Sequence, residues 1–355
     1  MAVVAMVKRV LLMCNSPLMA DHLSKFAAIF DDDRIKFYAA FVGRDDCIKR
    51  SKSILKIPDI CDPHDDLPLD GRFQWDLIVI ADHMQLPWHP TQKAPPPVLF
   101  IGHGAQGKRQ RGSKYPYGYD PRHTLDALGK PKYKCMFDVR PSDVEAGVKL
   151  VPKLKKVVKA VGSQHFDELL DYRKLERLSS SDRPTVFILS SWGRSSLIRR
   201  LGYSLINECK RLDYDFYVSI HPNEYNGDGW GHKVELQGLA VRRPDEPLGP
   251  YLAASDVVVC DHTSLCQSAA LMRKPIIFIK TDESLICPGS ITRRLYDLSL
   301  KLVNVNELKA VIEAMLAFRP WTQYDHLLGK IHPLAGQYER LAKREFYKLL
   351  KIRGK

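Results

Sequence analysis

Two histidines of this chain follow apolar, strand-like stretches, where a side chain could take part in catalysis. His103 comes directly after residues 97–101 and stands between Gly102 and Gly104, so the backbone can turn sharply and a ligand can approach closely. Histidine titrates near neutral pH, which suits a general base. The basic residues that follow and could surround an anion are Lys108, Arg109, Arg111 and Lys114. These residues alone fit a catalytic loop and an incidental histidine in a glycine-rich loop equally well.

The second histidine, His221, follows residues 216–220 and precedes Pro222. The proline fixes its own φ and biases His221 towards an extended conformation, so the histidine is held in place. A ligand contact and a loop histidine that bonds to a nearby backbone group both remain open here.

A third cluster of small polar residues lies between a buried strand, predicted for 257–261, and a helix predicted for 264–272. It contains Asp261, His262, Thr263 and Ser264. Unpaired N–H groups at a helix start, together with the helix dipole and the two hydroxyls, would form an anion site. Ordinary helix capping by Thr263 or Ser264 is compatible with that function.

Short apolar runs alternate with amphipathic helical stretches along most of the chain, a pattern typical of parallel sheets with crossover helices. Strands are predicted at 9–14, 35–42, 76–81, 97–101, 134–139, 156–161, 185–190, 216–220, 257–261 and 276–280. Residues 173–183 are polar and precede Pro184, so they predict a linker. We therefore predict an α/β protein with an N-terminal Rossmann-like domain at 1–175, a second one at 184–320 and a helical tail at 321–355 with its helix at 337–352.

Composition narrows the function classes. The 355 residues exceed the usual size of a single core, and 45% of them are hydrophobic, so two packed domains are expected. No apolar run could span a bilayer, the start does not resemble a secretory signal, and the eight cysteines form no C-x-x-C pair; we expect a soluble, cytoplasmic protein. The net charge of +13 fits a solvated basic surface or a polyanionic partner, which would be nucleic acid, an anionic membrane or a phosphate-rich substrate. No carboxylate cluster suggests a metal site.

Four motifs, in order, cover about half of the chain and resemble those of the CDP-glycerol glycerophosphotransferases, which include teichoic-acid polyol-phosphate polymerases. The matching segments are His103-Gly104-Ala-Gln-Gly-Lys108, Leu189-Ser-Ser-Trp192-Gly-Arg194, His221-Pro222, and Ser255-Asp256 through Asp261-His262-Thr263-Ser264 to Lys274-Pro275-Ile276-Ile277-Phe278. Val161-Gly162-Ser-Gln-His-Phe-Asp167 is similar to a further segment of that family.

The resemblance implies a GT-B-like fold, in which two Rossmann-like domains face a cleft, and transfer of a polyol phosphate from a CDP-linked donor to an acceptor hydroxyl. His103 would be the catalytic base that deprotonates the acceptor hydroxyl, and His221 would be a second catalytic residue that holds the donor diphosphate and offsets the charge that develops on the leaving CMP. The implied donor contacts are Arg194, Asp261, Thr263 and Ser264, and the implied acceptor or phosphate contacts are Gly104, Lys108 and Arg109. The implied partners are the nucleotide-linked donor and an anionic glycan or lipid-linked acceptor, with no separate cofactor and no nucleic acid.

The chain departs from the family at three points. Ala105 and Gln106 replace a Thr-Pro pair, Gly193 displaces the arginine that follows the tryptophan, and Ser268 stands where the family usually has an aspartate. A glycosyltransferase with a nucleotide-sugar donor and a UDP-sugar 2-epimerase are therefore kept as alternatives, and a non-enzymatic nucleic-acid-binding protein ranks below them. The basic C-terminal helix predicts either a peripheral membrane contact or a helix that packs back on the domains.

Overall fold

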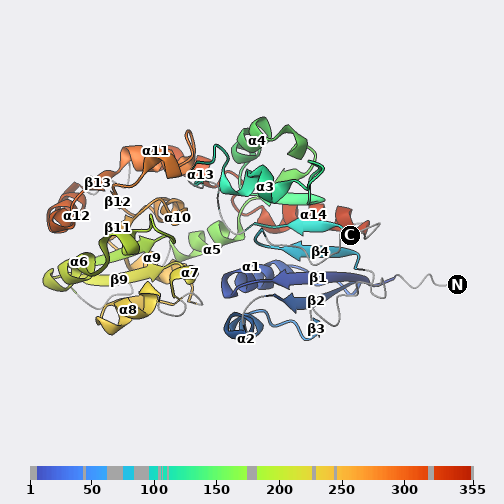
Figure 1. Cartoon of the computed structure of the whole chain (residues 1–355), viewed down its shortest axis with the longest axis horizontal. Coiled ribbons are helices and arrows are strands. Elements are labelled where there is room, and N and C mark those ends of the chain that lie inside the picture. Colours follow the sequence, from blue (N-terminus) through green and yellow to red (C-terminus); the bar gives the residue numbers. More distant parts are fainter. Residues whose placement is uncertain are drawn as a thin grey trace. The chain divides into compact units, whose positions relative to one another are not determined.

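The computed structural model describes residues 6–42, 45–61, 75–83, 96–102, 105, 107–109, 112–173, 182–225, 229–243, 246–318 and 324–352. The chain divides into two compact units (Figure 1). The first unit contains residues 1–104, 118–164 and 336–355, and the second contains 105–117 and 165–335.

The first unit is built on a parallel sheet with the strand order β3-β2-β1-β4-β5-β6-β7. Its strands are β1 (Lys8–Cys14), β2 (Ile35–Phe41), β3 (Ile60–Cys61), β4 (Leu77–Ile80), β5 (Val98–Phe100), β6 (Cys135–Asp138) and β7 (Val158–Ala160). Its helices are α1 (Pro17–Ala28), α2 (Asp45–Ile54), α3 (Pro121–Thr124), α4 (Pro141–Leu150) and α14 (Tyr338–Leu350). Ser16 caps α1 and Pro17 occupies its first turn, which explains why the helix begins directly after β1.

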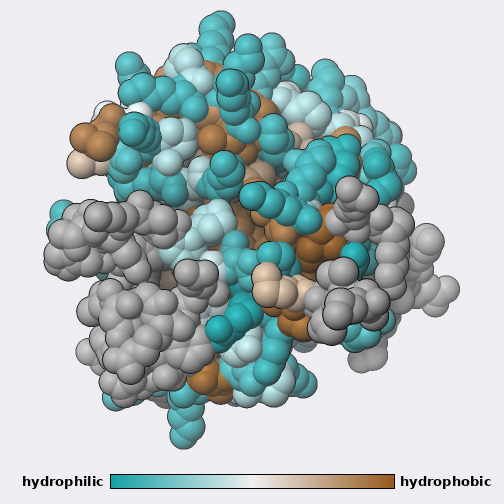
Figure 2. Space-filling model, turned by 90° about the vertical axis from the view of Figure 1, so that its right-hand side faces the viewer, coloured by the Kyte–Doolittle hydropathy of each residue, from teal (hydrophilic) through white to brown (hydrophobic). Residues whose placement is uncertain are grey.

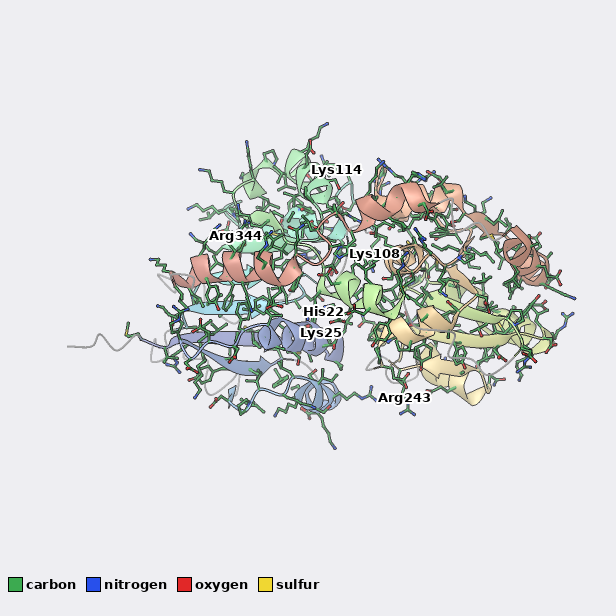
Figure 3. The ribbon with its side chains drawn as sticks, turned by 180° about the vertical axis from the view of Figure 1, so that it is seen from behind. His22, Lys25, Lys108, Lys114, Arg243 and Arg344 are labelled. Atoms are coloured by element: carbon green, nitrogen blue, oxygen red, sulfur yellow. The ribbon has the colours of Figure 1, made fainter. Side chains whose placement is uncertain are left out.

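The C-terminal helix α14 belongs to the first unit. Phe346 is fully buried, and its ring lies 5.5 Å from that of Phe26 and 4.2 Å from that of Phe30. The apolar stripe of the helix is therefore covered by protein, as expected if the helix packs back on the protein, and a membrane contact of its basic side chains stays a prediction. The basic side chains lie on the rest of the helix; Arg344 (Figure 3) bonds to Glu345 at 2.8 Å.

The second unit has a parallel sheet with the order β10-β9-β8-β11-β12-β13. Its strands are β8 (Thr185–Ser190), β9 (Asp215–Ile220), β10 (Ala240–Arg242), β11 (Val257–Cys260), β12 (Ile276–Ile279) and β13 (Leu300–Leu302). Its helices are α5 (Gln164–Tyr172), α6 (Leu197–Arg211), α7 (Pro222–Tyr225), α8 (Trp230–Leu236), α9 (Leu248–Ala254), α10 (Leu265–Leu271), α11 (Ile291–Leu298), α12 (Leu308–Phe318) and α13 (Asp325–Ile331).

Both sheets follow the Rossmann order, in which the chain reverses its direction of progress beside the first strand. Ligands of such folds bind at the carboxyl ends of the two strands at this switch point. In the first unit these strands are β1 and β4, and in the second they are β8 and β11. The predicted class, α/β with two Rossmann-like halves, is confirmed.

Several predicted boundaries need correction. Residues 321–355 do not form a separate tail, because α13 packs within the second unit and α14 within the first. Helix α5 also joins the second unit, so the change of unit precedes the predicted linker. The short strands β3, β10 and β13 were missed because two or three residues carry no clear alternation. Helix α6 begins at Leu197, and non-helical backbone at Gly202 interrupts it.

The described surface is mainly hydrophilic on the face shown in Figure 2, where apolar residues show in separate areas between polar ones. None of the helices that the structure describes is both long and apolar enough to cross a membrane.

Candidate functional site

Three of the sequence-predicted segments meet at one edge of the second sheet. Strands β9, β8 and β11 are parallel neighbours, so their carboxyl ends lie side by side. Arg194 lies in the loop after β8, His221 follows β9, and Thr263 follows β11. Residues almost seventy positions apart in the sequence are thus brought to the switch point of one unit.

Asp261 is the centre of the hydrogen bonding at this edge. Its fully buried carboxylate accepts bonds from the N–H and hydroxyl of Ser191, at 3.0 and 2.8 Å, and from the N–H of Leu197 and Thr263, at 2.8 and 2.9 Å. It therefore ties the loop after β8 and the start of α6 to the loop after β11. The sequence predicted Asp261 as a direct nucleotide contact. That contact stays a prediction, and in this structure the Asp261 oxygens accept hydrogen bonds from the two loops that the residue holds together.

The start of α10 offers fewer N–H donors than the sequence predicted. The N–H of Leu265 donates to the Thr263 hydroxyl at 3.4 Å, and those of Cys266 and Gln267 donate to the backbone oxygens of Thr263 and Ser264. Three of the N–H groups at this helix start thus have partners within the chain, and the anion site stays a prediction. The half-buried Ser264 makes no side-chain capping bond, so its hydroxyl takes no part in closing the helix.

His262 is a residue of this edge for which the sequence analysis gave no role. It is buried, and its Nδ1 lies 3.5 Å from the Thr281 hydroxyl. Burial lowers the pKa of His262, and the positive charges of Lys108 and Arg200 lower it further against the opposing effect of Asp261. At neutral pH the imidazole is therefore uncharged and acts as a hydrogen-bonding group. Its position directly after the buried aspartate was the available signal.

Lys108 and Arg109 belong to the second unit, although they follow the strand β5 of the first. Lys108 (Figure 3) forms an antiparallel bridge with Ile286, and the N–H of Arg109 donates to the oxygen of Leu285 at 3.0 Å. The fit is close, since a Cβ on Gly107 would lie 2.2 Å from the Thr292 hydroxyl. The two basic residues are thus held in the unit that contains His262.

His221 is fixed by the turn that follows it. The N–H of Asn223 donates to Nδ1 of His221 at 3.2 Å, and the N–H of Glu224 donates to its backbone oxygen at 2.8 Å. Because Nδ1 accepts, the proton of the neutral imidazole lies on Nε2, which can donate to a ligand. The ring of Trp192, which is 45% exposed, lies 5.9 Å from that of His221. Arg194, in the same loop as Trp192, is exposed.

Ser268, the third departure from the family, lies inside the second unit. It is buried, and its hydroxyl lies 3.1 Å from Nε2 of His165 in α5. Near it, Nε2 of His332 lies 2.7 Å from the Asp167 carboxylate. Where the family has an aspartate, this chain uses a serine–histidine pair that links α10 to α5.

His103 and Gly104, the predicted base and its neighbour, lie outside the described residues. The described part of the first unit carries another cluster near the ends of β4 and β5, which the sequence analysis missed. The ring of His83 stacks on Phe100 at 4.5 Å and on His123 at 5.1 Å, and its Nδ1 lies 3.0 Å from the Tyr133 hydroxyl. These residues are too far apart in the sequence to form a recognisable motif.

Metal ligands do not gather in the described part of the chain: no group of three or more His, Cys, Asp or Glu side chains there could hold a metal ion.

Comparison with known proteins identifies the fold. No family model and no curated protein sequence matches the chain. Among solved structures, the S. aureus MnaA–UDP complex has a TM-score of 0.59 at 11% identity, with 98% of both chains covered. The wall teichoic acid polymerase TagF with CDPG has a TM-score of 0.55 at 11% identity, covering 97% of this chain and 88% of its own. UDP-GlcNAc 2-epimerase from Neisseria meningitidis bound to UDP-GlcNAc also scores 0.55, at 13% identity and with 96% and 100% covered. The chain thus has the two-domain fold of GT-B-type enzymes.

Proposed function

We propose that the protein is a transferase that moves a polyol phosphate from a CDP-linked donor to a hydroxyl group of a cell-surface glycan or teichoic-acid-like acceptor. The polyol phosphate that we propose is glycerol phosphate. The observation that carries the proposal is the convergence of three motifs at the switch point of the second unit, around the buried carboxylate of Asp261. A donor diphosphate needs fixed hydrogen-bond donors and positive charge, and this edge offers both.

In this proposal the second unit binds the donor. Nε2–H of His221 and the hydroxyl of Ser264 donate to the diphosphate, and the cationic side chains of Arg194, Lys108 and Arg109 offset its charge. Thr263 supports the phosphate contact indirectly, because its backbone is joined directly to that of Ser264. Asp261 holds the loops without touching the ligand.

His103 is proposed as the general base that deprotonates the acceptor hydroxyl, which then attacks the phosphorus of the donor. The new P–O bond forms as the bond to the departing CMP breaks, and positive charge around the phosphate stabilises the charge that develops there. This role rests on the motif and its place after β5, since the residue itself lies outside the described part.

Binding of nucleotides tests the donor class. Calorimetry should show CDP or CTP binding to the parent, and Ser264→Ala should weaken it about three- to tenfold, the value of one hydrogen bond. Ser255→Ala is the matched control, because Ser255 lies at the opposite end of β11, where its hydroxyl bonds to Leu252. Equal losses of nucleotide affinity in both variants would show that the donor does not bind at this edge.

Turnover separates the two histidines. With CDP-glycerol and a hydroxyl-bearing acceptor, His103→Ala should lower turnover by roughly 10²- to 10⁴-fold and leave the donor dissociation constant nearly unchanged. His221→Ala should raise that dissociation constant and also slow turnover. His326→Ala, at an exposed position of α13, is the control. A His103→Ala variant that keeps most of its activity would show that the base lies elsewhere.

A UDP-linked donor is the second candidate, either for sugar transfer or for 2-epimerisation. It is favoured by the likeness in fold to proteins crystallised with UDP and UDP-GlcNAc. It would replace the first candidate if UDP and UDP-GlcNAc, but not CDP, raised the melting temperature of the parent and lost that effect in Ser264→Ala.

A further inference from the structure

We propose that Glu224 is a positioning residue of the donor site, which holds the loop of residues 192–194 in place beside His221. Glu224 is two residues beyond Pro222 in α7, and no motif of the sequence analysis includes it. The inference rests on the proposed function, because it assumes that this edge binds the donor.

The carboxylate of Glu224 is almost completely buried, and two groups from the neighbouring loop and helix donate to it. Its Oε1 accepts the N–H of Gly193 at 2.8 Å, and Nε of Arg199 lies 2.7 Å from both of its oxygens. The side chain of Arg199 is 47% exposed, so the positive charge that balances Glu224 reaches the surface. Glu224 thus connects the turn after β9 with the loop after β8 and with the first turn of α6.

This connection complements that of Asp261. Asp261 fixes Ser191 and Leu197, the two ends of the loop, whereas Glu224 fixes its middle. Gly193 has a φ of +84°, a conformation that leaves its N–H directed at the Glu224 carboxylate and that residues with side chains rarely adopt. The neighbours of Gly193 are Trp192, whose ring lies beside His221, and Arg194, a proposed donor contact. A change at Glu224 should therefore reach the ligand through these two side chains.

The position of Trp192 can be measured without any ligand. We would label the five tryptophans with 5-fluorotryptophan and assign the fluorine NMR signal of Trp192 by its loss in Trp192→Phe. In Glu224→Ala this signal should shift or broaden, because Gly193 loses its acceptor. In Glu224→Gln it should stay close to that of the parent, because the amide oxygen still accepts the Gly193 N–H. Glu208→Ala is the control, since Glu208 is also a buried carboxylate paired with an arginine, Arg211, on α6.

Donor affinity is measured on the same variants. Glu224→Ala should weaken CDP binding roughly tenfold to a hundredfold, the value of a charge-assisted bond, while Glu224→Gln should weaken it less than tenfold and Glu208→Ala should leave it unchanged. If the alanine variant does not fold, Glu224→Asp can replace it. This variant keeps the negative charge but moves it back by one methylene group, so the Trp192 signal should shift by a smaller amount.

An unchanged Trp192 signal in Glu224→Ala, or equal effects of alanine and glutamine, would overturn the positioning role. A parent that binds no nucleotide would overturn the proposed function instead, and the fluorine signal would still decide whether Glu224 holds the loop.

Discussion

In both units the first strand ends in a loop that starts the next helix, but the two units stabilise these ends differently. In the second unit the buried Asp261 joins the loops after β8 and β11 through four donors. In the first unit β1 ends in Cys14, whose thiol donates to the Ser16 oxygen at 3.1 Å, and Ser16 caps α1. One switch point is fixed by a shared carboxylate and the other by local capping.

The first unit places its buried charges at a different strand. At the end of β6, Asp138 accepts the Tyr119 hydroxyl at 2.6 Å, and the fully buried Arg140 pairs with Asp143 at 2.6 Å. The strand at the corresponding place in the second unit, β13, is followed by the exposed Val303. The same strand order therefore does not decide where polar groups are buried, and the donor site has to be inferred from the hydrogen bonds of each unit.

The largest effect is expected from Asp261→Asn. An amide has one acceptor oxygen, so at least one of the N–H donors from Ser191, Leu197 and Thr263 would face its NH₂ group. The loss of two charge-assisted bonds should lower the stability of the second unit by about 3 to 6 kcal/mol. Hydrogen exchange should show lost protection in peptides of β8 and β11 and retained protection in β1 and β4.

Asp256→Asn is the matched control for that change, because Asp256 accepts the Thr185 N–H at 2.8 Å at the opposite end of the same strands. If both variants lose protection equally, Asp261 at the carboxyl ends of the strands matters no more than Asp256 at their amino ends. The comparison between the two units would then fail.

Phe346→Ala should act on the first unit. Removing a fully buried phenylalanine costs about 3 to 5 kcal/mol, and here the ring contacts Phe26 and Phe30. Peptides of α1 and β2 should lose protection while those of β8 keep it. Exchange that changes in β8 rather than in α1 would show that α14 does not support the first unit.

Gly107→Ala sharpens the assignment of residues 105–117 to the second unit. The added Cβ would lie 2.2 Å from the Thr292 hydroxyl, and such overpacking costs about 1 to 3 kcal/mol. The denaturant midpoint should fall, and peptides of α11 should exchange faster. Gly329→Ala, in a helix where a Cβ meets nothing within 4 Å, should leave both measurements unchanged or slightly improved. A Gly107→Ala variant as stable as Gly329→Ala would refute the close fit.

The sequence predicted most of the strands because apolar runs such as 185–190 and 257–260 are long enough to show their pattern. It also predicted that His221 and Ser264 follow strands. It could not predict that residues 105–117 join the second unit, since that depends on the bridge between Lys108 and Ile286. The partners of Asp261 and Glu224 could not be predicted either, because they include backbone N–H groups whose positions only the fold defines.

The last prediction concerns the pH dependence of the first unit. Burial, together with the negative charge of the nearby Asp143 carboxylate, raises the pKa of Asp138 from its ordinary 3.8 to about 7. The folded state therefore binds a proton that the unfolded state releases between about pH 4 and pH 7. The associated stability is fully present below pH 4 and is lost as the pH rises towards 7, by roughly 1.4 kcal/mol per pH unit.

Hydrogen exchange in β6 peptides, corrected for intrinsic rates, should thus slow on acidification from pH 7.5 to 5.5, while peptides of β11 serve as the internal reference. Asp138→Asn should flatten this dependence, and Asp126→Asn, at an exposed turn of the same unit, should keep it. A slope that survives Asp138→Asn would show that the buried carboxylate of the first unit is not the titrating group.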